Sequence, residues 1–152
     1  MLDVLLNEIF PNLDRFAEEK KMQVLHEEYY PTTFFGNALF ELSASTFFIR
    51  ITRDRSQAWA HVSPRSEKDW YQLGDESWHY LDTIIRFLEG RPAWEQHTWE
   101  ENAANLNAEF IENALSRHYQ EIGALMKEDL TVAGFTAFEQ LEREMRRRGH
   151  ST

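Results

Sequence analysis

The stretch that decides the fold reads FFIRITRDRSQAWAHV and covers residues 47–62. Ile49 and Ile51 share one face of a strand and Arg50 lies on the other, because side chains alternate along a strand. The polar run Asp54-Arg55-Ser56 then favours a turn, and a second strand follows it. This stretch therefore predicts an antiparallel hairpin.

Toward the N-terminus, the chain from Met22 onward has a similar strand-like texture. An aromatic turn region lies at Tyr29-Tyr30-Pro31, and a short connection at Ser43-Ala44-Ser45. Connections this short leave no room for the crossover that parallel strands need. We therefore expect an antiparallel meander of three or four strands, which ends at Pro64 and makes a strand-rich segment at 22–63.

Helical periods flank this meander. Apolar residues recur at helical spacing from Leu2 to Phe16, and Pro11 must either kink this helix or begin a second one. A second helical stripe runs from Trp78 to Leu88 and stops at Gly90-Arg91-Pro92. Two more amphipathic helices are expected, at 103–126 and at about 136–148.

The chain is therefore predicted to be a single α+β domain covering 1–152. The expected order is an N-terminal helix, the antiparallel meander, and a helical segment at 76–148 whose three or more helices pack on the sheet. We find no internal repeat and no linker rich in Pro or Gly that would divide the chain.

Composition limits the cellular compartment and the kind of binding partner that we expect. The 152 residues carry 16 Lys and Arg against 26 Asp and Glu, for a net charge of −10, and there is no Cys. The missing cysteines exclude a disulfide framework and thiolate metal sites, and the acidic start is unlike a secretory signal, so we expect a cytoplasmic protein. No apolar run approaches the roughly 18 residues of a membrane span. The acidic balance disfavours nucleic acid and favours a basic protein partner.

No residue spacing demands a particular chemistry. There is no HExxH, and the only compact carboxylate–imidazole pair is Glu76-x-x-His79, whereas a di-iron bundle needs that motif twice. Phosphate-binding glycine loops and the G-x-S-x-G nucleophile elbow are also missing. We therefore expect no catalytic residues, no metal and no cofactor.

Aromatic and charged clusters are the best candidates for contact with a partner, because Trp, Tyr and Arg are enriched at binding hot spots. Two arginines stand at the predicted hairpin turn, an aromatic pair follows the meander, and two tryptophans stand among acids further along. The candidate contact residues are Arg53, Arg55, Trp70, Tyr71, Trp94, Trp99, Glu100 and Glu101.

Part of the chain, about residues 22–90, resembles a group of small uncharacterised bacterial proteins. Four runs carry the resemblance: Tyr30-Pro31, Phe35-Gly36-Asn37-Ala38, Arg50-x-x-Arg53-Asp54-Arg55-x-Gln57 and Trp70-Tyr71-x-Leu73. Size and acidity are similar to those of immunity proteins that neutralise bacterial toxins. The resemblance implies a bacterial interaction protein and transfers no functional residues.

Our leading hypothesis is a non-catalytic protein-binding module, an immunity-like protein that blocks a toxin or another enzyme. The first alternative is a small-molecule binder or minor enzyme, with Arg50, Trp59 and His61 lining a pocket between the sheet and the helices. The second alternative is a structural homodimer that buries the helix at 103–126 against its twin.

Overall fold

The computed structural model describes residues 1–32, 36–65, 69–74, 77–92, 106–128 and 133–148. Its centre is a five-stranded antiparallel sheet whose strands follow one another in chain order. The strands are β1 (Gln23–Tyr30), β2 (Asn37–Ser43), β3 (Phe47–Asp54), β4 (Gln57–Pro64) and β5 (His79–Tyr80). The predicted α+β class and antiparallel meander are confirmed.

The predicted hairpin at 47–62 is present as β3 and β4. Asp54 pairs with Gln57, so the turn between the strands has two residues, and Arg55 adopts a positive φ of 59°. Two-residue hairpins favour positive φ because that turn matches the right-handed twist of the strands. The side-chain Oδ1 of Asn37 accepts a hydrogen bond of 3.0 Å from the Arg55 backbone N–H, which ties this turn to β2.

The helices are α1 (Val4–Ile9), α2 (Pro11–Glu19), α3 (Leu81–Leu88), α5 (Ala108–Glu128) and α6 (Ala133–Arg147). Pro11 begins a second helix, because at the first helical position its missing N–H leaves no hydrogen bond broken. The buried Asp14 of α2 accepts hydrogen bonds from the backbone N–H groups of Leu2 and Asp3, which holds α1 against α2.

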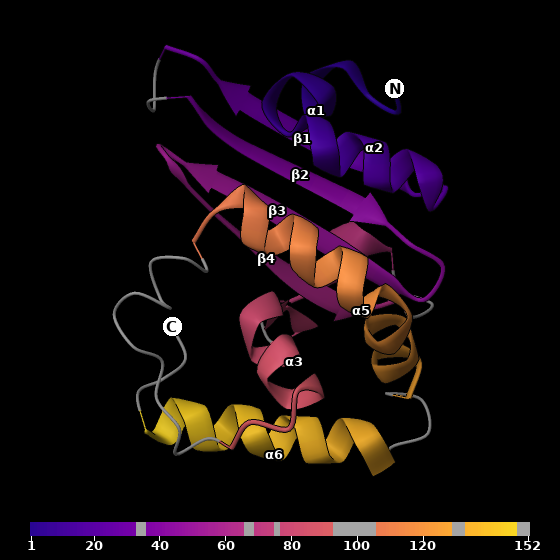
Figure 1. Cartoon of the computed structure of the whole chain (residues 1–152), viewed down its shortest axis with the longest axis vertical. Coiled ribbons are helices and arrows are strands. Elements are labelled where there is room, and N and C mark those ends of the chain that lie inside the picture. The colour runs from indigo at the N-terminus through magenta and orange to yellow at the C-terminus, as the bar shows by residue number, and fades with distance from the viewer. Residues whose placement is uncertain (33–35, 66–68, 75–76, 93–105, 129–132, 149–152) are drawn as a thin grey trace.

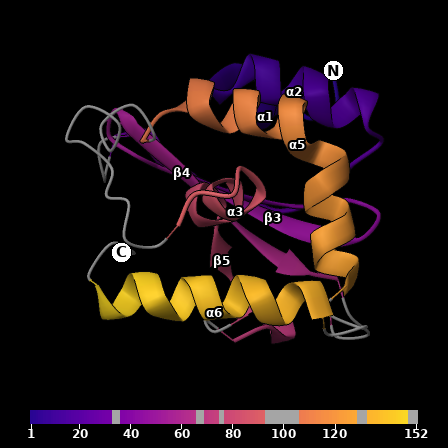
Figure 2. The ribbon, with the colours of Figure 1, turned by 60° about the horizontal axis from the view of Figure 1, so that its bottom comes forward.

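One face of the sheet lies under α1, α2 and α5 (Figures 1 and 2). On that face Ile49 and Ile51 of β3 line a tight apolar space with Leu13 of α2 and Leu115 of α5. Gly123 lets α5 approach the β2–β3 turn closely, because an added Cβ would lie 3.1 Å from Thr46 Oγ1. Its carbonyl oxygen accepts a hydrogen bond of 2.8 Å from that hydroxyl.

The end of the domain near β5 differs from the expectation. The second helical stripe was expected to include Trp78, but His79 and Tyr80 pair with β4 as a short fifth strand, and α3 starts only at Leu81. The helix α6 packs against α3 and α5, away from the β1 edge of the sheet (Figure 1). No helix in the described parts of the chain has both the length and the apolar sequence needed to cross a membrane.

Candidate functional site

The second face of the sheet presents polar and aromatic side chains. It is built by the residues that alternate with those facing α2 and α5, and strand pairing sets three rows of them side by side, with a buried row of Ser43, Phe48 and Ser63 beyond. We call these rows the open sheet face. The outer row is Tyr30, Asn37, Asp54 and Gln57; the middle row is Glu28, Leu39, Thr52 and Trp59; the central row is His26, Glu41, Arg50, His61 and Tyr80.

The central row crosses all five strands. His26 lies opposite Glu41, Glu41 opposite Arg50, Arg50 opposite His61, and His61 opposite Tyr80. Directly opposed side chains on one face are close enough to interact. The row therefore forms a continuous line of titratable groups.

Aromatic rings fix the middle of this row. The guanidinium of Arg50 lies 4.2 Å from the ring centroid of Trp78, and the ring of His61 lies 4.2 Å from that of Tyr80. Stacking of a guanidinium on an indole is a favourable cation–π arrangement. Glu41 lies on the other side of Arg50, with 3.6 Å between Arg50 Nη2 and Glu41 Oε2.

Burial governs the charge state of the row. Burial raises the pKa of Glu41 from its usual 4.5, and the positive charge of Arg50 opposes this effect. Burial, followed by the nearby charges of Arg50 and His79, lowers the pKa of His61 from 6.5 to about 4. His61 is therefore neutral at physiological pH and offers one donor and one acceptor.

Several buried polar atoms of this region have no hydrogen-bond partner within the described residues. They are Glu41 Oε2, Arg50 Nε, His61 Nδ1, Ser63 Oγ and Trp78 Nε1. Most buried polar groups in folded proteins are hydrogen-bonded, and each exception calls for an explanation. Glu41, Arg50 and His61 belong to the central row, and Ser63 and Trp78 lie beside it; such a concentration is more typical of a binding site than of a structural core.

A hollow of about 260 Å³ lies at the middle and outer rows, toward the β3–β4 turn, and no residue of the central row lines it. Leu39 and Thr52 are neighbours in the middle row, with Trp59 beyond them on β4 and Tyr30 in the adjoining outer row. Further lining comes from Asn37, Ala38, Arg53 and Asp54. An apolar and aromatic lining with a few polar groups suits a side chain inserted by a partner.

The structure brings together part of the predicted site. Arg50, Trp59 and His61 do share one face, but that face lies away from α1, α2 and α5, so the expected pocket between sheet and helices is wrong for these residues. The reason is alternation along β3, which turns Ile49 and Ile51 toward the helices and Arg50 away from them.

The predicted partner contacts fall in several places. Arg53 lines the hollow, and Arg55 lies in the adjoining turn. Tyr71, in the short 3₁₀ helix Trp70–Gln72, is 66% exposed, and only the backbone of Trp70 is described. Four further predictions, Trp94, Trp99, Glu100 and Glu101, lie outside the described residues.

Sequence reasoning missed Glu41, Trp78 and Tyr80. The alternation of β2 could have placed Glu41 on the same face as Leu39, but its position opposite Arg50 depends on strand register. Trp78 was assigned to a helix, and nothing local in the sequence indicates that it covers Arg50.

The part of the chain that the structure describes contains no group of three or more His, Asp or Glu side chains that could hold a metal ion. No protein-family model, curated protein or solved structure matches the chain.

Proposed function

We propose that this protein is a non-catalytic binding module that acts in the cytoplasm and takes up a basic protein partner on its open sheet face. Its role would be that of an immunity-like protein, which binds a toxin or another enzyme and blocks it. The observation that carries this proposal is the hollow between Tyr30 and Trp59, which lies on the same face of the sheet as the buried Glu41 and the partly exposed Arg50.

The residue types on the open sheet face support protein binding. Tyr30, Trp59 and Tyr80 supply aromatic surface, Arg50 supplies a stacked guanidinium, and the face contains no Lys. Interfaces are enriched in Tyr, Trp and Arg and depleted in Lys. The face carries three acids, Glu28, Glu41 and Asp54, against one arginine, so its own charge also favours a basic partner.

The net charge of −10 favours a basic partner. Like-charged partners are repelled at long range, and opposite charges raise association rates when the salt concentration is low. Steering therefore comes from the acidic chain as a whole, and affinity comes from the aromatic anchors of the open sheet face.

The two alternatives fit less well. A hollow of about 260 Å³ is smaller than the roughly 300–1,000 Å³ typical of small-molecule sites. The homodimer through residues 103–126 needs an apolar helix face that is free to bind a second copy. Ile111, Leu115 and Ile122 of α5 are instead buried in the domain's own core.

The test is recovery of partners from the native host with the wild-type protein, Trp59→Ala and Tyr71→Ala. Trp59 lines the hollow, and Tyr71 is an exposed aromatic outside the open sheet face, so the two variants separate the two surfaces. Trp59→Ala is expected to weaken binding of a recovered partner by about 30-fold or more, the effect of a hot-spot residue, with Tyr71→Ala close to wild type.

Two results would count against this proposal. One is recovery of no partner at any salt concentration. The other is a partner whose binding is lost in Tyr71→Ala and retained in Trp59→Ala, which would move the interface to the segment around 69–74.

A further inference from the structure

The hollow on the open sheet face is lined by aromatic and apolar side chains that solvent reaches. Tyr30 of β1 and Trp59 of β4 lie at its two sides, and Leu39 of β2 and Thr52 of β3 lie on the strands between them. None of these four residues is buried, and Tyr30 is 40% exposed. A side chain of a partner therefore has access to this lining.

One carboxylate borders the hollow. Asp54 is the last residue of β3, it lines the hollow, and it is exposed. Its pairing with Gln57 and the alternation along β3 place it on the open sheet face. Among the described residues, its carboxylate makes no hydrogen bond or ion pair. Asp54 thus offers a negative charge beside aromatic rings.

Two arginines close to Asp54 in the sequence do not compensate this charge. Arg53 also lines the hollow, but it pairs with Ala38 and Ala58, whose buried side chains lie on the other side of the sheet. The backbone of Arg53 therefore contributes to the floor of the hollow, and its Nε donates a hydrogen bond of 3.2 Å to the Arg55 carbonyl oxygen. Arg55 itself is not among the described residues that line the hollow.

The charge around the hollow favours a cationic occupant. Glu28 lies opposite Leu39, so a second carboxylate stands next to the lining, and the whole chain has a net charge of −10. The face of an aromatic ring attracts cations and repels anions. A cationic side chain is therefore attracted both by Asp54 and by the rings, whereas an anionic side chain is repelled by both.

Among cationic side chains, arginine matches this lining better than lysine. Its guanidinium is flat and stacks on aromatic faces, and its paired N–H donors match the two oxygens of a carboxylate. It is also more weakly hydrated than an ammonium, so less hydration is lost when it enters the hollow. Its apolar stem packs on apolar surface while the charged end stays at the rim.

We infer that the hollow binds an arginine side chain of the protein partner, with the guanidinium paired to Asp54 and stacked on Trp59. The stem of that arginine lies over Leu39 and Thr52. This inference deepens the proposed function and rests on it, because it names the side chain that the basic partner inserts.

Short capped glycine peptides whose central residue is arginine, citrulline or lysine test this inference on the full chain. Citrulline has nearly the shape of arginine without its charge, because a urea group replaces the guanidinium. Each peptide is titrated into the isotope-labelled protein at constant ionic strength, while NMR follows Trp59 Nε1–H and the backbone N–H of Asp54. The arginine peptide is expected to shift both signals to saturation. Its dissociation constant should be about fivefold or more below that of the citrulline peptide, and below that of the lysine peptide.

A matched pair of variants identifies the charge responsible. Asp54→Asn removes the carboxylate at nearly constant shape, so this variant should bind the arginine and citrulline peptides equally. Glu109→Gln removes one charge from an exposed position on α5 and should keep the preference for arginine. Since the wild-type peptide series needs no variant, poor folding of a substituted protein does not remove the test.

Four results would overturn the inference: equal binding of the arginine and citrulline peptides to the wild type, tighter binding of the lysine peptide, no saturable shift at Trp59, or a preference for arginine that persists in Asp54→Asn. These results are separate from failure of the proposed function. If a recovered partner depends on Trp59 while arginine is not preferred, the open sheet face remains the interface and only the arginine assignment falls. If the arginine peptide binds as expected and no partner is recovered, the proposed function falls and the chemistry of the hollow stands.

Discussion

His79 and Glu142 form a buried hydrogen bond that joins the edge of the sheet to the last described helix. His79 Nδ1 lies 2.7 Å from Glu142 Oε2, and both side chains are less than 10% exposed. The rings of Phe135 and Phe138 pack edge-on against the His79 ring, at 5.5 and 5.2 Å between centroids. This pair therefore anchors α6 to β5 inside an aromatic cluster.

Removal of this anchor should destabilise the fold. Glu142→Ala leaves a buried nitrogen of His79 without its partner, which costs about 2 kcal/mol of unfolding free energy. Urea denaturation followed by circular dichroism measures the change.

A surface pair of the same chemistry provides the control for the anchor. His118 Nδ1 lies 2.9 Å from Glu121 Oε1, but the Glu121 side chain is 54% exposed. Glu121→Ala should therefore change the unfolding free energy by no more than about 0.5 kcal/mol. Equal losses of unfolding free energy in the two variants would show that burial does not determine how strongly the His79–Glu142 pair stabilises the fold.

The Glu41–Arg50 pair should contribute little to stability. Arg50→Met keeps a side chain for packing on Trp78 but leaves the buried carboxylate of Glu41 without its opposite charge, so we expect a loss of about 2 kcal/mol. The double variant Glu41→Leu/Arg50→Met should regain this loss or exceed the wild-type stability. A double-mutant cycle in urea measures the coupling, and strictly additive losses would contradict an interaction between Glu41 and Arg50.

His61 should make the protein less stable in acid. Because the pKa of His61 falls from 6.5 in the unfolded chain to about 4 in the fold, the unfolded chain holds the extra proton between these values. The free energy of unfolding should therefore fall as the pH is lowered from about 6.5 to 4, by at most about 3.5 kcal/mol at 1.4 kcal/mol per pKa unit. His61→Gln should flatten that part of the stability curve, and an unchanged slope would exclude His61 as its source.

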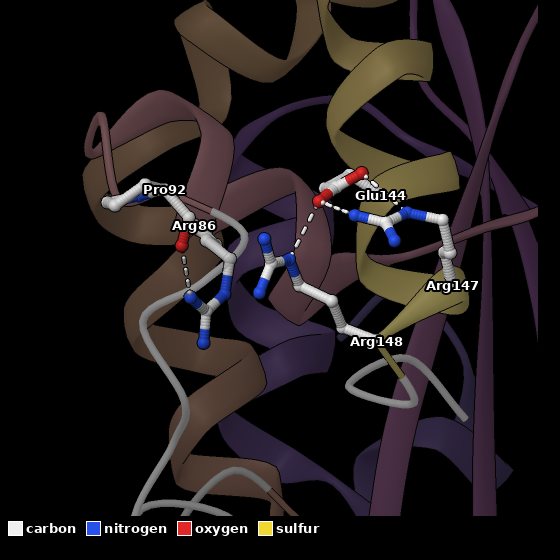
Figure 3. Close-up of polar contacts among 5 residues, drawn as sticks. All are labelled: Arg86, Pro92, Glu144, Arg147 and Arg148. Carbon is white, nitrogen blue, oxygen red and sulfur yellow. Dashed lines mark hydrogen bonds and ion pairs between the residues drawn. The ribbon is translucent and has the colours of Figure 1, made fainter.

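Protonation of Glu144 should reduce stability at a lower pH than protonation of His61 does. In α6 it accepts hydrogen bonds from Arg147 and Arg148, which lower its pKa from 4.5 to about 2 (Figure 3). The stabilising contribution of Glu144 is present above about pH 4.5 and is lost as the pH falls through 2. Carboxyl NMR should give a titration midpoint near 2.

Substitution of the two arginines checks the cause of this shift. Replacing both Arg147 and Arg148 with Gln removes the charged donors, so the midpoint should return toward 4.5. A midpoint that stays near 2 would mean that other groups hold the carboxylate ionised.

The sequence predicted the elements whose signals are local. The β3–β4 hairpin was predicted from alternation and a turn between the strands, and Pro11 was expected either to kink the first helix or to begin a second one, which is what it does. The two-residue strand β5 was missed because His79 and Tyr80 are too few to show a period. Their strand conformation depends on pairing with His61 and Val62 of β4.

The candidate site could be predicted only within one hairpin. Arg50, Trp59 and His61 were named together from the sequence, and they do share a face because alternation and a short turn relate them directly. Their partners Glu41, Trp78 and Tyr80 come from other segments. Which of these side chains oppose Arg50 and His61 depends on register and on the path of the chain after β4.

Composition and short-range periodicity by themselves determined an acidic α+β chain without cysteines, with a central hairpin between helical segments. Tertiary structure decided which face of the sheet α1, α2 and α5 cover, and so which side chains form the open sheet face. The physical reason is that a strand has two faces of opposite character, and only burial of its apolar face against helices distant in the chain selects the register that aligns Glu41, Arg50 and His61.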